Sequence, residues 1–145
     1  MIRLLDTKES ILVVNVDILT NINFYQVMKY HKQHQADATL VISDKKTQRP
    51  LAIDGTLKFI GRFDPTMPVR LSKAYLFCGI QVIQPWIFSS FPDTVFYSID
   101  AYIRALTLNA KIIGYLDNQS YWLDIGTIDD YEKAELDVKN GLLSA

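Results

Sequence analysis

The stretch Ile11-Leu12-Val13-Val14-Asn15-Val16-Asp17 decides the fold class of this 145-residue chain. Its run of apolar residues is typical of a strand that is covered on both faces, as strands are in a parallel sheet. Residues 21–33 follow with apolar side chains at helical spacing and with Asn21 as a candidate N-cap. Residues 38–43 form the next apolar run. A strand, a helix and a second strand in this order predict a β-α-β unit.

The rest of the chain continues the alternation of strands and helices, with a polar, basic loop at 44–50 and irregular chain at 62–73. We expect the remaining elements over these ranges: a hairpin at 51–60 that turns at Asp54-Gly55, a strand at 74–83 interrupted by Gly79, a short helix after Pro85, a helix capped by Ser98, strands at 111–116 and 121–124, and a helix from Thr127 to near Gly141. This pattern predicts an α/β fold with a mixed, Rossmann-like sheet in one domain that spans residues 1–145.

The composition excludes several classes of protein. Hydrophobic residues make up 49% of the chain, which is too many for a disordered chain, yet the apolar runs are too short to span a membrane. The net charge of −1 shows no basic surplus, so we expect no nucleic-acid partner. A single cysteine, Cys78, and an N-terminal stretch without the apolar core of a signal peptide together predict a cytoplasmic protein.

Carboxylates follow two of the predicted strands. Asp17 comes after the first strand, and Asp124 comes between the strand at 121–124 and the last helix. Because ligands bind beyond the carboxyl ends of strands in open α/β sheets, both acids are candidates to face one crevice. Two converging carboxylates suit a hard cation such as Mg²⁺ that bridges to phosphate oxygens. The simpler interpretation is that Asp17 caps a turn and Asp124 caps the helix.

Three motifs resemble those of the sugar-1-phosphate nucleotidyltransferases. They are LVVNVDILT at Leu12–Thr20, FCGIQVI at Phe77–Ile83 followed by Pro85, and WLDIGT at Trp122–Thr127. In that family the motifs usually read N-G-D, F-x-G-I and W-x-D-x-G-T, and they occur in the same order in the central and C-terminal parts of the enzymes. The closest resemblance is to mannose-1-phosphate guanylyltransferase-like and N-acetylmuramate-1-phosphate uridylyltransferase-like members.

The resemblance implies roles for individual residues. Asp17 and Asp124 match the two aspartates that hold Mg²⁺ and are the implied catalytic pair. Asn15 would shape the substrate pocket, and Gly79 would let the backbone approach the sugar. In such enzymes a sugar 1-phosphate attacks the α-phosphorus of a nucleoside triphosphate, so that pyrophosphate leaves and a nucleoside-diphosphate sugar forms.

Two further residues are candidates for substrate binding on their position alone. Arg49, in the basic loop, is the best placed of its charged residues to reach a phosphate. Trp122 is either a core residue or a wall of the pocket. His31 and His34 are compatible with a metal pair on a helix, but a helix surface is the simpler interpretation, and Cys78 is expected in the core.

One element of the family pattern is missing, and one position departs from it. The glycine-rich loop G-x-G-x-R, which wraps the triphosphate, does not occur in the 145 residues, and Val16 stands where the family has glycine. We therefore expect the C-terminal portion of a nucleotidyltransferase, inactive alone, whose partner is a missing N-terminal segment or a second copy. The alternative is a degenerate transferase domain that acts as a sugar-phosphate-binding or regulatory module.

Overall fold

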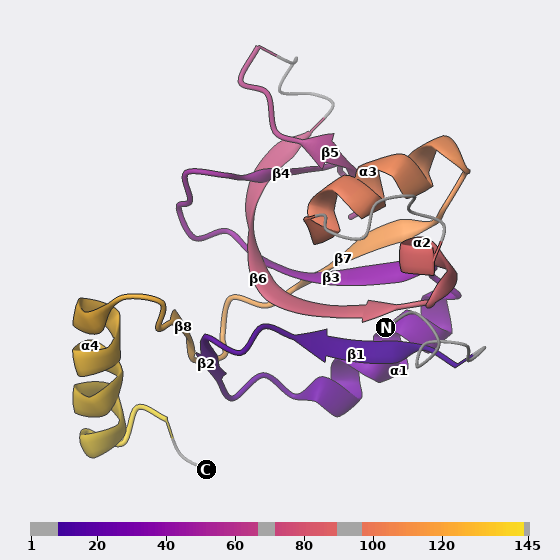
Figure 1. Cartoon of the computed structure of the whole chain (residues 1–145). Coiled ribbons are helices and arrows are strands. Elements are labelled where there is room, and N and C mark those ends of the chain that lie inside the picture. The colour runs from indigo at the N-terminus through magenta and orange to yellow at the C-terminus, as the bar shows by residue number, and fades with distance from the viewer. Residues whose placement is uncertain (1–8, 67–71, 90–96, 144–145) are drawn as a thin grey trace.

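The fold is organised around one long strand, β6 (Lys73–Ile83), in the computed structural model of this chain (Figure 1). The structure describes residues 9–66, 72–89 and 97–143. β6 pairs antiparallel with β3 (Ala38–Ser43), and β3 pairs in parallel with β7 (Ile112–Leu116). The mixed sheet that the sequence predicts is therefore present.

Two further strands pair with β6, one near each of its ends. β4 (Leu51–Ile53) pairs with its first three residues and also forms a hairpin with β5 (Phe59–Arg62), while β1 (Ile11–Val14) pairs with its last four residues. β1 and β3 both run antiparallel to β6, so they are parallel to each other with β6 between them. The predicted β-α-β unit is thus present with a third strand inserted.

A second, two-stranded sheet, which the sequence does not predict, lies beside the main one. β2 (Ile18–Thr20) pairs antiparallel with β8 (Trp122–Asp124). The sequence predicts β8, within the run at 121–124, but not β2, because no local pattern separates those three residues from the strand before them. The side chain of Asp117, which accepts hydrogen bonds from the backbone N–H groups of Gln119 and Ser120, turns the chain from β7 toward β8.

Helices cover both faces of the main sheet. α1 (Phe24–His34) packs on the face that carries Val41, Ile80 and Val82, whereas α2 (Trp86–Ser89) and α3 (Ser98–Thr107) pack on the face that carries Leu40 and Ile42. Alternate residues of β1 also pack toward opposite faces. This double coverage explains why the strands read as continuous apolar runs.

Of the three helix N-cap residues that the sequence predicts, one is confirmed. Thr127 caps the last helix, α4 (Ile128–Lys139), by accepting a hydrogen bond from the N–H of Asp130 at 3.2 Å. The cap of α1 is Asn23 rather than Asn21, whose side chain instead accepts a hydrogen bond from the N–H of Tyr121. Ser98 does not cap α3 but is its first residue, and the N-cap, Tyr97, makes no capping hydrogen bond with its side chain.

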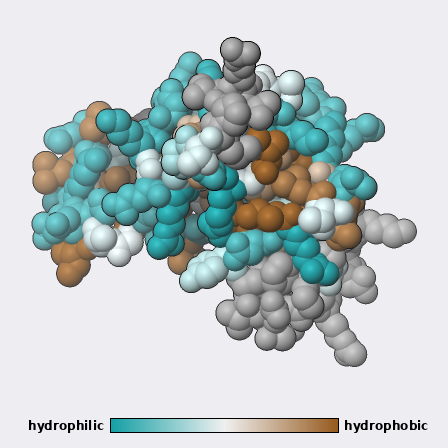
Figure 2. Space-filling view, turned by 90° about the horizontal axis from the view of Figure 1, so that it is seen from above, coloured by the Kyte–Doolittle hydropathy of each residue, from teal (hydrophilic) through white to brown (hydrophobic). Residues whose placement is uncertain are grey.

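α4 extends beyond the two-stranded sheet, at one side of the molecule (Figure 1). Among its residues one, Ala134, is buried. In the space-filling view, brown apolar side chains lie among the hydrophilic ones on this part of the surface, at the left of the picture (Figure 2). Within the described ranges, no helix has the length and apolar character that crossing a membrane requires.

Candidate functional site

The two-stranded sheet brings Asp17 and Asp124 together. Asp124 is paired with Ile18, the neighbour of Asp17, and the N–H of Ile125 donates a hydrogen bond of 2.8 Å to the carbonyl of Asp17. The two residues are more than a hundred positions apart in the chain, and these backbone contacts hold them side by side. The juxtaposition therefore depends on backbone pairing and not on the conformations of the two side chains.

Both carboxylates border the same space above Gly126. A Cβ atom on Gly126 would lie 3.0 Å from Oδ1 of Asp124 and 3.9 Å from Oδ2 of Asp17. The N–H of Gly126 donates a hydrogen bond of 2.9 Å to the same oxygen of Asp124, which orients that carboxylate. Glycine at this position keeps the space between the two acids free.

Within the described part of the chain, no side chain forms an ion pair with either of these carboxylates. Among the described residues, the ion pairs are Arg62 with Asp100 and Lys139 with Glu135, and neither involves Asp17 or Asp124. Asp17 is half-buried and Asp124 is exposed. Because like charges at short range repel each other, a cation between the two carboxylates would be favourable.

The donor set fits Mg²⁺ with a partly open coordination sphere. Mg²⁺ is commonly bound in proteins through one or two carboxylates, with water and phosphate oxygens as its remaining ligands. No cluster of three or more His, Cys, Asp or Glu side chains that could hold a metal exists in the described part of the chain. An ion at this site would therefore take its other ligands from water or substrate.

A hollow of about 430 Å³ lies where β6 changes partners, between the residues paired with β4 and those paired with β1. Leu76 and Phe77 of β6 form part of its wall. Asn15, which follows β1, enters it from one end, and Arg49 and Arg62 enter it from the region of β4 and β5. The hollow thus adjoins the segment that carries Asp17.

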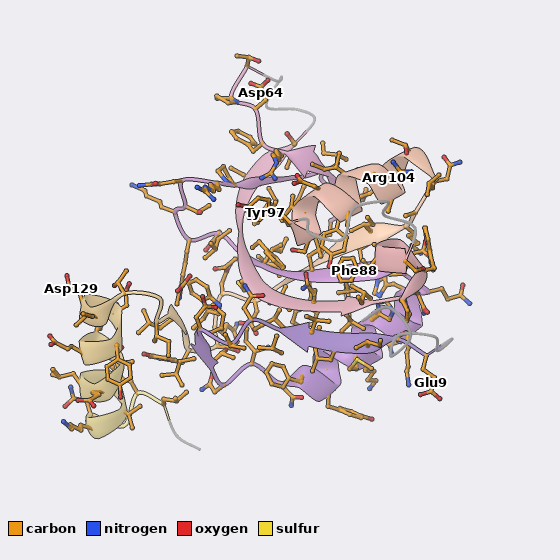
Figure 3. All side chains as sticks on the ribbon, viewed as in Figure 1. Glu9, Asp64, Phe88, Tyr97, Arg104 and Asp129 are labelled. Atoms are coloured by element: carbon orange, nitrogen blue, oxygen red, sulfur yellow. The ribbon has the colours of Figure 1, made fainter. Side chains whose placement is uncertain are left out.

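The electrostatics of the hollow favour an anion. Arg49 is exposed and makes no ion pair within the described residues, whereas Nη2 of Arg62 lies 2.7 Å from Oδ1 of Asp100. α3 begins at the hollow with Ser98, and Figure 3 shows its N-cap residue Tyr97 at this end of the helix. A guanidinium group and the start of a helix both attract phosphate.

Gly79 lies directly beneath Asn15. It has a φ of +71°, and a Cβ atom on it would be 3.0 Å from Nδ2 of Asn15 and 3.0 Å from Cγ1 of Ile18. The N–H of Asn15 also donates a hydrogen bond of 2.8 Å to the carbonyl of Gly79. The space that a side chain on Gly79 would occupy is thus filled by the residues around Asp17.

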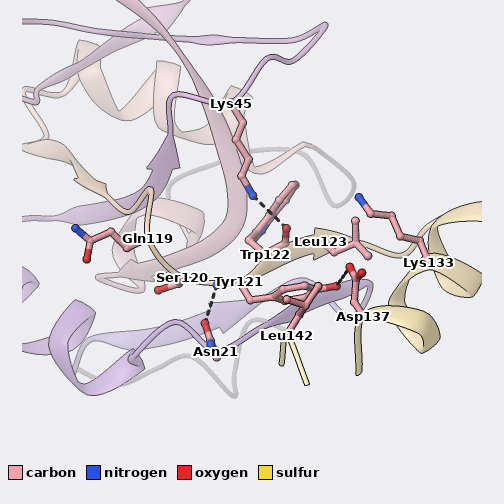
Figure 4. A pocket seen from close by; sticks show the side chains of 10 residues that line it. All are labelled: Asn21, Lys45, Gln119, Ser120, Tyr121, Trp122, Leu123, Lys133, Asp137 and Leu142. Atoms are coloured by element: carbon pink, nitrogen blue, oxygen red, sulfur yellow. Dashed lines mark hydrogen bonds between the residues drawn. The ribbon is translucent and has the colours of Figure 1, made fainter. Parts of the chain in front are cut away.

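Trp122 lies apart from this hollow. Its Nε1 donates a hydrogen bond of 2.8 Å to the carbonyl of Cys78, and the ring packs against the core face on the α1 side. It lines a different hollow, in which Nζ of Lys45 donates to the carbonyl of Trp122 and lies 5.5 Å from the ring centroid (Figure 4). The structure therefore groups Trp122 with Lys45, not with Arg49.

The histidines and the cysteine belong to the packing of the fold. His31 is buried, and its ring nitrogens are 2.9 Å from Oγ1 of Thr39 and 3.1 Å from Oγ of Ser10. The expectation of a helix surface is wrong for His31 and correct for His34, which is exposed. Cys78 is buried as expected, and burial raises the pKa of its thiol to about 12.

Sequence reasoning missed Arg62 and the two-stranded sheet. The sequence predicts irregular chain from Arg62 onward, whereas Arg62 ends β5 and lines the hollow; of that predicted irregular stretch, residues 67–71 lie outside the described residues. The signal that could have identified Arg62 is the hairpin turn at Asp54-Gly55, since extending its second strand by two residues brings Arg62 opposite Leu51.

Known proteins resemble this chain in sequence. No protein-family profile matches it. Mannose-1-phosphate guanylyltransferase of Mycobacterium tuberculosis is 23% identical over 140 residues, which are 92% of this chain and 38% of that protein. Mannose-1-phosphate guanyltransferase of Schizosaccharomyces pombe is 25% identical over 125 residues, which are 82% of this chain and 33% of that protein. The chain thus spans about a third of the length of these curated relatives.

Solved structures resemble it in fold. HddC from Yersinia pseudotuberculosis, also crystallised with GMP-PN, superposes with a TM-score of 0.69 at 15% identity over 92% of this chain and 56% of its own. A putative glucose-1-phosphate thymidylyltransferase from Bacillus anthracis gives a TM-score of 0.71 at 14% identity, over 93% and 56% of the two chains. The chain is therefore similar to sugar-1-phosphate nucleotidyltransferases in sequence and in its mixed α/β fold.

Proposed function

We propose that this chain provides the metal-binding and sugar-phosphate-binding part of a nucleotidyltransferase. The reaction transfers a nucleotidyl group from a nucleoside triphosphate to a sugar 1-phosphate: an oxygen of the sugar phosphate bonds to the α-phosphorus, and the bond to pyrophosphate breaks. The observation that carries the proposal is the shared space above Gly126, which both Asp17 and Asp124 border. The names of the relatives support this class of reaction.

The candidate residues would form two neighbouring sites, one for the metal ion and one for the sugar phosphate. Asp17 and Asp124 would hold Mg²⁺, which supplies charge neutralisation at the reacting phosphates when bound. Arg49 in the hollow would orient the sugar phosphate. Asn15, between the hollow and Asp17, would hold the sugar-phosphate site and the metal site at a fixed position relative to each other. Phosphoryl-transfer enzymes gain their rate chiefly from such positioning and electrostatic stabilisation.

Nucleotide binding is the step for which these 145 residues offer least. They contain no G-x-G-x-R sequence whose backbone N–H groups would surround a triphosphate. We therefore expect the chain by itself to bind metal and sugar phosphate without catalysing transfer, and to need a second polypeptide segment for activity. A module that binds sugar phosphate for regulation would share the first two properties and would never gain activity.

The metal site can be tested directly with Mn²⁺ as a probe, by electron paramagnetic resonance on the full 145-residue chain. Asp17→Asn and Asp124→Asn should each weaken Mn²⁺ binding by about tenfold or more, since each removes one of the two carboxylates. Asp129→Asn, on exposed α4, is the matched control and should leave binding unchanged. Equal binding by all four proteins would contradict the proposed metal site.

Transfer itself is tested by adding a separate N-terminal segment from one of the guanylyltransferase relatives. Formation of a nucleoside-diphosphate sugar that depends on Asp17 and Asp124 would support the enzyme portion. Tight binding of a sugar 1-phosphate, without transfer in any such mixture, would instead support the binding module.

A further inference from the structure

The last helix presents an apolar stripe that the rest of the described chain leaves uncovered. Ile128, Tyr131, Val138 and Leu142 are 77%, 54%, 48% and 60% exposed. Together with Glu135 they recur at spacings of three and four residues, which places them on one side of the helix and its continuation. Figure 3 shows α4 at the edge of the molecule with many of its side chains projecting outward. Exposed apolar stripes of this kind mark contact surfaces.

A second uncovered surface lies on the outer side of α1. Val27 and His31 are the buried residues of this helix, whereas Phe24, Tyr25 and Met28 border a hollow of about 580 Å³ on its other side. Tyr25 is 72% exposed. The hollow is lined mainly by apolar atoms, and Lys29 and Lys32 stand at its border.

The two surfaces are complementary in charge. α1 contains Lys29 and Lys32 and no acidic residue between Phe24 and His34. α4 contains five acidic residues and two lysines; Glu135 lies within the stripe and Glu132 borders it. Association of the α4 stripe with the hollow beside α1 would be favoured by the burial of apolar surface and by the attraction of opposite charges.

We propose that the apolar stripe of α4 in one copy of this chain packs into the hollow beside α1 of a second copy. Within one copy the two helices cannot meet, because α4 stands beyond β2 and β8, on the far side of these strands from α1 (Figure 1). Two copies related by twofold symmetry would form the contact twice, since each copy offers both surfaces. The proposal does not depend on the proposed function.

Charge reversal tests the contact through sedimentation velocity of the full chain. The wild type should form a dimer that weakens as salt concentration rises. Lys29→Glu with Lys32→Glu makes both surfaces acidic, and Glu132→Lys with Glu135→Lys makes both basic, so each variant alone should be monomeric. An equimolar mixture should dimerise, because both contacts of the mixed pair are again complementary. Lys46→Glu with Lys73→Glu, at exposed positions outside both surfaces, should leave the dimer intact.

Disulfide trapping tells this dimer from one formed through another surface. The natural cysteine, Cys78, is buried, so introduced cysteines would react selectively. Met28→Cys mixed with Tyr131→Cys should give an intermolecular disulfide on mild oxidation, whereas Thr56→Cys mixed with Tyr131→Cys should not. A wild-type chain that stays monomeric at all concentrations, or a dimer that both charge reversals leave unchanged, overturns the proposal. A monomer that instead binds a separate N-terminal segment through α4 also overturns it.

Discussion

Asn15 occupies the space that a side chain on Gly79 would need. Nδ2 of Asn15 is 3.0 Å from the position of a Cβ atom on Gly79, and the backbone N–H of Asn15 donates a hydrogen bond to the carbonyl of Gly79. Pairing of β1 with β6 ends just before Asn15, and this contact fixes the point from which the chain turns toward Asp17. The place of the candidate metal site therefore depends on a glycine in a neighbouring strand.

Gly79→Ala should destabilise the fold by about 1–3 kcal/mol, because the new Cβ meets Asn15 and Ile18 and the φ of +71° is unfavourable for alanine. Urea denaturation of the variant and the wild type measures the difference. Gly55→Ala is the control, since a Cβ atom there has no neighbour within 4 Å. Equal losses in the two variants would mean that the contact with Asn15 does not matter.

Gly126→Ala should separate metal binding from stability. The new Cβ would lie 3.0 Å from Oδ1 of Asp124, so this carboxylate must move, but the residue is exposed and its φ is an ordinary one. We expect an unfolding free energy within about 1 kcal/mol of wild type and a several-fold weaker affinity for Mn²⁺, measured by electron paramagnetic resonance. Unchanged affinity would show that the space above Gly126 is not where the ion binds.

The sequence predicts the elements of this fold better than it predicts their partners. The apolar runs of β1, β3 and β6 are long enough to be recognised, and Thr127 with Asp130 marks the start of α4. β2 is not predicted because no local pattern separates its three residues from β1, although its pairing with β8 is what joins Asp17 to Asp124. Arg62 was missed for a related reason, since the length of a short strand beyond a turn follows from its partner.

The pH dependence of stability tests the buried state of His31. Burial lowers the pKa of its imidazole below the ordinary value of 6.5, with the charge of Lys32 acting in the same direction and that of Asp37 opposing it. The unfolded chain therefore binds the proton more readily, so the stability that neutral His31 provides is present above about pH 6.5 and is lost as the pH falls toward the folded-state pKa. Urea denaturation at pH 7.5 and 5.5 measures this loss.

His31→Gln is the matched variant for this prediction. It should be less stable than wild type at pH 7.5, because the bonds to Thr39 and Ser10 are altered, and its stability should change less between the two pH values. Asp54 and Asp117, whose pKa values hydrogen bonding lowers against the opposing effect of desolvation, lose their contribution only at more acidic pH. An identical pH dependence in wild type and His31→Gln would exclude His31 as the cause.

Arg49 and Asp100 should change anion binding in opposite directions. Arg49→Gln removes a guanidinium that no carboxylate of the described chain neutralises, so binding of a sugar 1-phosphate at the proposed site should weaken by about tenfold. Asp100→Asn breaks the 2.7 Å ion pair with Arg62 and releases a second guanidinium toward the hollow, so binding should tighten. Because this pair is about half exposed, its loss should cost at most about 1 kcal/mol of stability.

Isothermal titration calorimetry measures the change in sugar-phosphate affinity in both variants, with Lys46→Gln in the same loop as Arg49 as the control. Weaker binding by Asp100→Asn would show that Arg62 serves the packing of α3 and not the ligand.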